Sequence, residues 1–363
     1  MKNMKKLWNN KQTREQLIIY LTVTVAFLVM QFLSANGMLG SAMKGFLVPV
    51  CSYIVLAVSL NLLVGVCGEL SLGHAGFMGI GAFSGIIISA LLAQVIPNGS
   101  LRLVAAMFCG GVMAGFMGFL IGIPTLRLRG DYLAIVTLAF GEIIKNIVNN
   151  LYIGLDGAGL HVSLTTARFS LEEGGKMILD GPVGATGIHR ISSFPMGYAL
   201  IMLTLFVALN LIHSKEGRAI KAVRDNRIAA ESVGINVTAF RMKAFVVSAA
   251  LAGMAGALYG LNMSSIAASK FNFNTSINIL VFVVLGGMGN IMGSVISATV
   301  LYILPEAMRG LDDLRMILYA VVLIVVMLCT WSPKIKGALQ LFALTVKNKV
   351  VGMFKKKEAD PNA

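Results

Sequence analysis

Long apolar runs separated by short polar stretches dominate this chain. A helix that crosses a bilayer needs ~20 mostly apolar residues, so the pattern predicts an all-α polytopic membrane protein with roughly ten transmembrane segments. We expect them at about 17–34, 46–64, 75–95, 103–123, 132–152, 195–212, 242–262, 274–287, 290–306 and 315–331. The eighth and ninth segments are short and nearly adjoin, so they are either two full spans or the halves of a broken or re-entrant hairpin.

The composition supports a membrane protein. Hydrophobic residues make up 57% of the chain and charged residues 13%, whereas a soluble domain carries about 25% charged residues. The net charge of +14 does not indicate a nucleic-acid partner, because the basic residues gather at the ends of apolar runs, as orientation signals do. We therefore expect contact with membrane lipid and none with nucleic acid. The cysteines and histidines lack metal-ligand spacing, so no metal and no cofactor is expected.

The basic residues also predict the orientation. With the N-terminus in the cytosol, 21 of the 30 Lys and Arg residues fall on the cytosolic side and 8 outside, which favours cytosolic termini. The expected parts are a cytosolic N-terminus (1–16), a transmembrane domain (17–331) with an outer loop (154–194) and a cytosolic segment (213–241), and a basic cytosolic tail (332–363). The outer loop, with two glycine-rich turns, either caps the outer mouth for a soluble partner or is a flexible connector.

A glycine-rich stretch at 68–83 interrupts the helical pattern and includes polar residues. Unwound backbone at membrane depth is tolerated where it lines a cavity, so this stretch is a candidate wall of a substrate pathway. The candidate residues are Glu69, Ser71, Gly73, His74 and Gly76. The alternative is that the glycines only allow helices to approach each other closely.

Charged residues within a span are costly and indicate function by default. Glu142 and Lys145 lie three residues apart in the segment 132–152, so they share a helix face and can form an ion pair. Glu142, together with Thr137, is alternatively part of a polar pathway wall. Glu142 is the only acid placed deep in a span, which disfavours a carrier driven by protons or sodium.

The segment 213–241 is basic and amphipathic, unlike the chain around it. It predicts two short helices, at 219–224 and 227–233, with Asp225 or Asn226 as the cap of the second and Gly234 in the left-handed position after it. Ile220, Val223, Ala230 and Val233 form the expected apolar stripe. Such an element either enters a groove on a partner or lies on lipid.

Motifs for catalysis are missing. The sequence contains no G-x-x-x-x-G-K-[ST] phosphate-binding loop, no H-E-x-x-H and no G-x-S-x-G. We therefore expect a transport protein without enzymatic activity of its own, and any ATP binding must belong to another chain.

The stretch GRAIKAVRDNRIAAESVGINVTAFRMKAFVVSAALAGMAGALYG (217–260) strongly resembles the cytosolic loop and following helix of branched-chain amino acid ABC permeases. Residues 61–83, 126–147 and 285–298 resemble the same family in the same order. The resemblance implies a multi-pass subunit in the bacterial inner or plasma membrane that pairs with a second permease subunit, two cytosolic ATPase subunits and an extracytoplasmic substrate-binding protein.

The resemblance also implies that the cytosolic segment is a coupling helix seated in an ATPase. That role carries over to Arg218, Arg224, Asp225, Ala229, Ala230, Glu231 and Gly234. Ile228 stands where the importer pattern has Glu, and Arg227 stands where relatives often carry an acid.

Two other functions remain open from the sequence. One is an ABC permease for urea, short amides or another small polar solute, because specificity lies largely in the binding protein. The other is a self-sufficient secondary carrier or channel, which would take up its solute without ATPase subunits.

Overall fold

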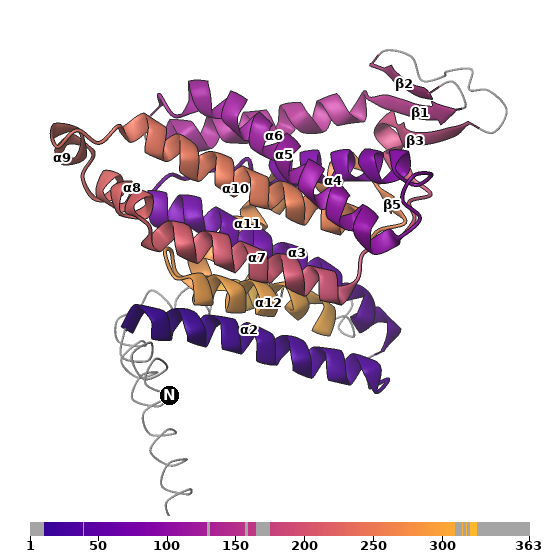
Figure 1. The fold of residues 1–363 in the computed structure, drawn as a ribbon, viewed down its shortest axis with the longest axis horizontal. Helices are drawn as coiled ribbons and strands as arrows, with labels where there is room; N and C mark the ends of the chain where they lie inside the picture. Colours follow the sequence, from indigo (N-terminus) through magenta and orange to yellow (C-terminus); the bar gives the residue numbers. More distant parts are fainter. Residues whose placement is uncertain are drawn as a thin grey trace, which may run out of the picture. The chain divides into compact units, whose positions relative to one another are not determined.

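The computed structural model describes residues 11–38, 40–128, 131–156, 159–164, 175–308, 314, 317 and 320–324, and these are mostly helical (Figure 1). The chain divides into two units, Met1–Ile303 and Leu304–Ala363, and the contacts below are within the first. The helices are α2 (Lys11–Ala35), α3 (Ser41–Asn61) continued by a π-helix (Leu62–Cys67), α4 (His74–Leu91), α5 (Gly99–Thr125), α6 (Asp131–Asn149), α7 (Phe194–His213), α8 (Lys215–Asp225), α9 (Arg227–Ser232), α10 (Val237–Gly260), α11 (Phe273–Gly286) and α12 (Ile291–Ala307).

Among the described residues, eight helices are long and apolar enough to cross a membrane. They coincide with the first eight predicted segments, and α11 reaches span length only with the 3-10 turn Ala268–Lys270 before it. The ninth segment is α12, an apolar helix of 17 residues. The tenth, 315–331, lies mostly outside the described residues, as do residues 1–10 and the tail 332–363. The count of ten and the cytosolic termini therefore stay predictions.

Helices α4, α5 and α10 pack on one another and form the centre of the unit together with α3. Glycines bring their backbones together: a Cβ on Gly81 of α4 would lie 2.0 Å from the carbonyl oxygen of Gly253 of α10. A Cβ on Gly253 would in turn lie 2.5 Å from the carbonyl oxygen of Gly110 of α5. Small residues are the usual means of close helix packing in membranes. We call α4, α5 and α10 the three-helix block.

The prediction of an all-α fold is wrong for the loop after α6. Strand β1 (Tyr152–Asp156) pairs antiparallel with both β2 (Gly159–Ser163) and β3 (Lys176–Asp180). A second small sheet joins β4 (Ala185–Thr186) to β5 (Ser265–Ile266), which follows α10. These strands are too short, and β1 and β2 too interrupted by glycine, to show an alternating pattern, so pairing across the loop sets them. The described part of the outer loop is thus built around a sheet, unlike a flexible connector.

The loops at the two ends of this unit differ in kind. Helices α8 and α9 lie at one end of the long helices, and strands β1–β3 and β5 lie at the other (Figure 1). Their placement on opposite sides of a membrane stays a prediction.

Candidate functional site

The segment 213–241, which we call the loop segment, folds as two helices, as predicted. Helix α8 begins four residues earlier than expected, at Lys215, because the Ser214 side chain caps it by accepting a hydrogen bond from the Gly217 amide at 3.0 Å. Gly217 is required there, since a Cβ would lie 2.1 Å from the Leu211 carbonyl oxygen. Ile220 and Val223 form the rest of the buried face of α8.

Helix α9 is capped by Asn226, whose side chain accepts from the Ala229 amide at 3.0 Å. Of the two predicted caps, Asp225 is not used, and its carboxylate instead contacts Arg224 at 3.0 Å. Gly234 has a φ of +82°, the predicted left-handed position after the helix. The loop segment is therefore an ordered element with its own caps.

The buried side of α9 differs from the predicted apolar stripe. Ala230 is buried against Val223 and Val237, with Ile235 packed on them. Val233 is instead 75% exposed and Ile228 is 80% exposed. The predicted stripe is therefore divided: Ile220, Val223 and Ala230 are buried within the protein, and Val233, the residue before the turn at Gly234, is exposed.

Other predicted residues of the loop segment lie on its surface. Glu231 is exposed and pairs with Arg227 one turn away at 3.0 Å. Arg218 is exposed, and its guanidinium donates to the His213 carbonyl at 3.4 Å. The Ala229 side chain is also exposed.

Arg224 ties the loop segment to the membrane helices. Its Nη1 donates to the carbonyl oxygen of Gly65 at 2.8 Å, within the π-helix that ends α3. Its Cγ would lie 2.5 Å from a Cβ on Gly68. Gly68 has a φ of +78° and closes the π-helix in a left-handed conformation that suits glycine. Arg224 thus joins α8 directly to the end of the α3 span.

Asn61 connects the same π-helix to a third part of the chain. It is fully buried, and its Nδ2 donates to the Asn290 carbonyl at 3.0 Å and to the Ser294 Oγ at 2.8 Å. Its Oδ1 accepts from the Gly289 amide at 2.7 Å. The turn between α11 and α12 is therefore held by the start of the π-helix. Such helices are rare and often occur at functional sites.

Glu69, predicted as a pathway carboxylate, forms an ion pair with Arg241 of α10. Arg241 is 4% exposed and also donates from Nη1 to the Leu126 carbonyl at 3.1 Å. The pair joins the break after the π-helix to the start of α10 and the end of α5. Sequence reasoning did not single out Arg241, although a charged residue beside an apolar segment was the signal.

Four predicted pathway residues meet where α4 begins against α6. The Thr137 Oγ1 accepts from the Leu72 amide at 3.1 Å, and the Ser71 Oγ accepts from the Gly73 amide at 3.4 Å. A Cβ on Gly73 would lie 2.6 Å from the Thr137 carbonyl oxygen, and one on Gly76 would lie 2.9 Å from the Cα of Gly141. The two hydroxyl groups accept hydrogen bonds from amides of the unwound backbone, and the two glycines allow α4 to contact α6.

His74 and Glu142 lie on either side of this contact. His74 is 1% exposed, and its Nε2 is 2.9 Å from the Ser59 Oγ, while its Nδ1 has no partner among the described residues. Glu142 forms the predicted ion pair with Lys145. Glu142 also borders a narrow space where the start of α11, at Asn272 and Phe273, meets α4 and α6. Helices α4 and α11 therefore both begin at this junction.

Comparison with known proteins gives a consistent result. The model of the family "branched-chain amino acid transport system / permease component" matches residues 42–328. The chain is 35% identical over 292 residues to the high-affinity branched-chain amino acid transport system permease protein LivM of Escherichia coli, covering 78% of this chain and 67% of LivM.

Two further relatives are more distant. The LivH permease protein of Escherichia coli, from a high-affinity branched-chain amino acid transport system, is 27% identical over 69% of this chain and 79% of its own. The nucleoside ABC transporter permease protein NupC of Lactococcus lactis is 23% identical over 54% of this chain and 60% of its own. No solved structure gives a significant match.

Proposed function

Because the chain belongs to the family of branched-chain amino acid transport permeases, we propose that it is the transmembrane subunit of an ATP-driven importer for branched-chain or related small amino acids. It lies in the bacterial cell membrane with both termini in the cytosol. Separate ATPase subunits dock on the loop segment and supply the energy, and an extracytoplasmic binding protein delivers the cargo to the opposite end.

The relatives support the cargo and the pairing with a second permease. Identity is 35% to LivM and 23% to the nucleoside permease NupC, which favours branched-chain amino acids over nucleosides. LivM and LivH are both permease proteins for high-affinity branched-chain amino acid transport in Escherichia coli. We therefore expect this chain to pair with a different, LivH-like permease subunit and two ATPases.

The exposed tip of the loop segment is the observation that carries the docking proposal. Ile228 and Val233 are 80% and 75% exposed, although the segment is ordered and the large apolar residues of α8, Ile220 and Val223, are buried. Large apolar side chains held out on a rigid helical tip fit a groove on a partner protein. Ile228 stands at the position where the importer pattern has Glu, so here the contact is apolar.

The ties to the membrane helices support a path for the motion. Arg224 holds the Gly65 carbonyl, and Asn61 holds the turn at Gly289 and Asn290. When ATP binding displaces α8 and α9, the end of the α3 span and the α11–α12 turn are pulled with them. Coupling of this kind requires that ATP and cargo stabilise different arrangements of the same helices.

A matched pair of substitutions tests the docking. Val233 in the loop segment and Val95 at the opposite end are both 75% exposed. Val233→Asp should abolish ATP-driven leucine uptake by the reconstituted complex and reduce recovery of the ATPase with the permease, because it places a charge in an apolar contact. Val95→Asp should leave both unchanged. Equal uptake by the two variants would refute docking at this tip.

Reconstitution of the chain alone separates the importer from a secondary carrier. Leucine uptake is expected only with ATP, both ATPase subunits and the binding protein present. Uptake by vesicles that contain this chain without ATPase subunits would instead favour a self-sufficient carrier. Uptake of urea or short amides, but not leucine, by the complete complex would overturn the cargo while leaving the ATP-driven mechanism intact.

A further inference from the structure

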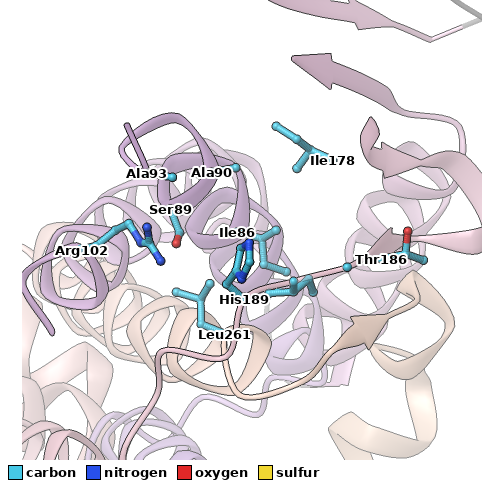
Figure 2. A pocket seen from close by; sticks show the side chains of 11 residues that line it. Ile86, Ser89, Ala90, Ala93, Arg102, Ile178, Thr186, His189 and Leu261 are labelled. Atoms are coloured by element: carbon cyan, nitrogen blue, oxygen red, sulfur yellow. The ribbon is translucent and has the colours of Figure 1, made fainter. Parts of the chain in front are cut away.

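A small pocket lies at the end of the helices opposite the loop segment (Figure 2). It has a volume of about 60 Å³ and is formed by the last turns of α4, the first turn of α5, the strands β3 and β4, and the chain that follows β4. Its walls are mostly apolar, with Ile86, Ile178 and Leu261 among them. The pocket thus joins the small sheets of the outer loop to the three-helix block.

Arg102 brings a positive charge to this pocket that the described part of the chain does not neutralise. Its Nε is buried without a hydrogen-bond partner, no described residue forms an ion pair with it, and no Asp or Glu is among the described residues that line the pocket. Arg102 lies in the first turn of α5, where the helix dipole disfavours a cation. An anion in the pocket would offset both costs.

Two further polar side chains line the same pocket. Ser89 of α4 is 6% exposed, and His189 follows β4. Neither is hydrogen-bonded to another residue in the described part of the chain. In Figure 2 the Arg102 side chain extends from α5 toward Ser89, and His189 is among the residues that line the same pocket. A hydroxyl, an imidazole and a guanidinium therefore surround one space, and all of them can donate hydrogen bonds.

We propose that Arg102, with Ser89 and His189, binds the carboxylate of the amino acid cargo as it enters the permease. A guanidinium binds a carboxylate through two parallel hydrogen bonds, which also orient it. The pocket exceeds the roughly 10–15 Å³ that an ordered water needs, so a carboxylate fits, and Ile86, Ile178 and Leu261 are placed to contact an aliphatic side chain. This assignment rests on the proposed import of amino acids and names the group first recognised.

Ligand-induced stabilisation of the full chain in lipid nanodiscs tests the site without the ATPase. L-Leucine and isovalerate should raise the thermal unfolding midpoint of the wild type, whereas leucinol, which lacks the carboxylate, should not. Arg102→Gln should remove the response, and Arg102→Lys should weaken it. The matched control is Arg190→Gln, because Arg190 is exposed and donates to Ser264 in the same outer loop region; its response should equal that of the wild type.

Several outcomes would overturn the assignment. One is an equal response to leucine in Arg102→Gln; another is an equal response of the wild type to leucinol. A third outcome is an unfolding midpoint that rises with anionic phosphatidylglycerol in the nanodisc, in the wild type but not in Arg102→Gln, and does not respond to leucine. That result would assign the site to a lipid phosphate. Weaker docking of the cargo-free binding protein to Arg102→Gln would assign it to a carboxylate of that protein.

Transport then separates this site from the coupling proposal. In the complete complex, Arg102→Gln should raise the KM for leucine about tenfold or more, as expected for loss of a charged hydrogen-bond donor, with basal ATP hydrolysis unchanged. If the loop segment does not dock an ATPase, Val233→Asp leaves uptake unchanged, while the leucine-dependent midpoint shift still distinguishes Arg102→Gln from the wild type. An unchanged KM in Arg102→Gln would contradict carboxylate binding.

Discussion

Two arginines in early turns of long helices have opposite surroundings. Arg241, at the loop-segment end, pairs with Glu69 and donates to the Leu126 carbonyl, so two of its three nitrogens are used and only Nε lacks a partner. Arg102, at the other end, has neither a carboxylate nor a carbonyl partner among the described residues. The charge of Arg241 is neutralised inside the chain and holds the break after the π-helix, α5 and α10 together. The charge of Arg102 is available to a ligand that binds reversibly, which we propose is the cargo carboxylate.

The largest difference is expected when each arginine is replaced by leucine. Arg241→Leu leaves the Glu69 carboxylate without its partner, and breaking a buried pair typically costs about 3–5 kcal/mol. Arg102→Leu removes an uncompensated charge and should leave stability unchanged or increase it. Thermal unfolding midpoints of the purified chains measure the stability of each variant. Equal midpoints for Arg241→Leu and Arg102→Leu would refute the difference between the two arginines.

A second substitution sharpens this prediction. Replacing both members of a buried pair by apolar residues is often neutral, so Glu69→Leu added to Arg241→Leu should recover much of the lost stability. No recovery would mean that the Leu126 hydrogen bond, and not the ion pair, dominates.

Two asparagines extend the comparison with a smaller effect. Asn61→Ala removes three hydrogen bonds at a buried position near the loop segment and should cost about 1–3 kcal/mol, because the groups left behind cannot reach water. Asn150 follows the last residue of α6. Asn150→Ala removes one exposed hydrogen bond to the Asn146 carbonyl and should cost little. Hydrogen exchange at 287–290 should rise only in Asn61→Ala; unchanged exchange there would refute the tie to the α11–α12 turn.

Two glycines compare the helix starts. Gly73→Ala forces a Cβ to within 2.6 Å of the Thr137 carbonyl oxygen, and overpacking of this kind costs about 1–3 kcal/mol. Gly99→Ala, at the start of α5, meets Ile191 only at an ordinary 3.4 Å and should be neutral. Unfolding midpoints of the two variants measure the difference, and a neutral Gly73→Ala would mean that α4 and α6 separate easily.

The smallest effect is expected at Glu142. Its side chain is 37% exposed and that of Lys145 is 22% exposed, and a partly solvated pair contributes about 0–1 kcal/mol. Glu142→Gln should therefore leave the unfolding midpoint almost unchanged and leucine uptake within about twofold. A large loss of uptake at unchanged stability would instead place Glu142 in the substrate pathway.

The sequence predicts the long helices well because each needs only a continuous apolar run. It also predicts the turn at Gly234, which depends on local backbone chemistry. Strands β1 and β2 could not be predicted, because they are neighbours in the chain but lack an alternating pattern. The strands β4 and β5 could not be predicted either, since the partners Ala185 and Ile266 lie far apart in the sequence. The partners of Arg224 and Asn61 were missed for the same reason: Gly65 is 159 residues from Arg224, and Gly289 is 228 residues from Asn61.

The candidate pathway was predicted less well than the loop segment. Local patterns identify Ser71, Gly73 and Gly76 as unusual but cannot say whether they face a cavity or a neighbouring helix. In the structure Ser71 accepts a hydrogen bond from a backbone amide, and Gly73 and Gly76 allow α6 to pack closely against the start of α4. Arg102 entered the sequence reasoning only as one of the basic residues outside, because its isolation depends on which side chains surround it.

The backbone contacts among Gly81, Gly110 and Gly253 limit how this protein can change shape. At these crossings the backbones approach each other directly or across no more than an alanine methyl group, such as that of Ala114 beside Gly253. Little can re-pack if one helix slides, so we expect α4, α5 and α10 to move as a single rigid body. Opening and closing must then occur along its borders, where α6, α11 and the end of the α3 span meet it. Bulkier residues engineered at those borders should trap one state, whereas the same residues at the crossings should prevent assembly.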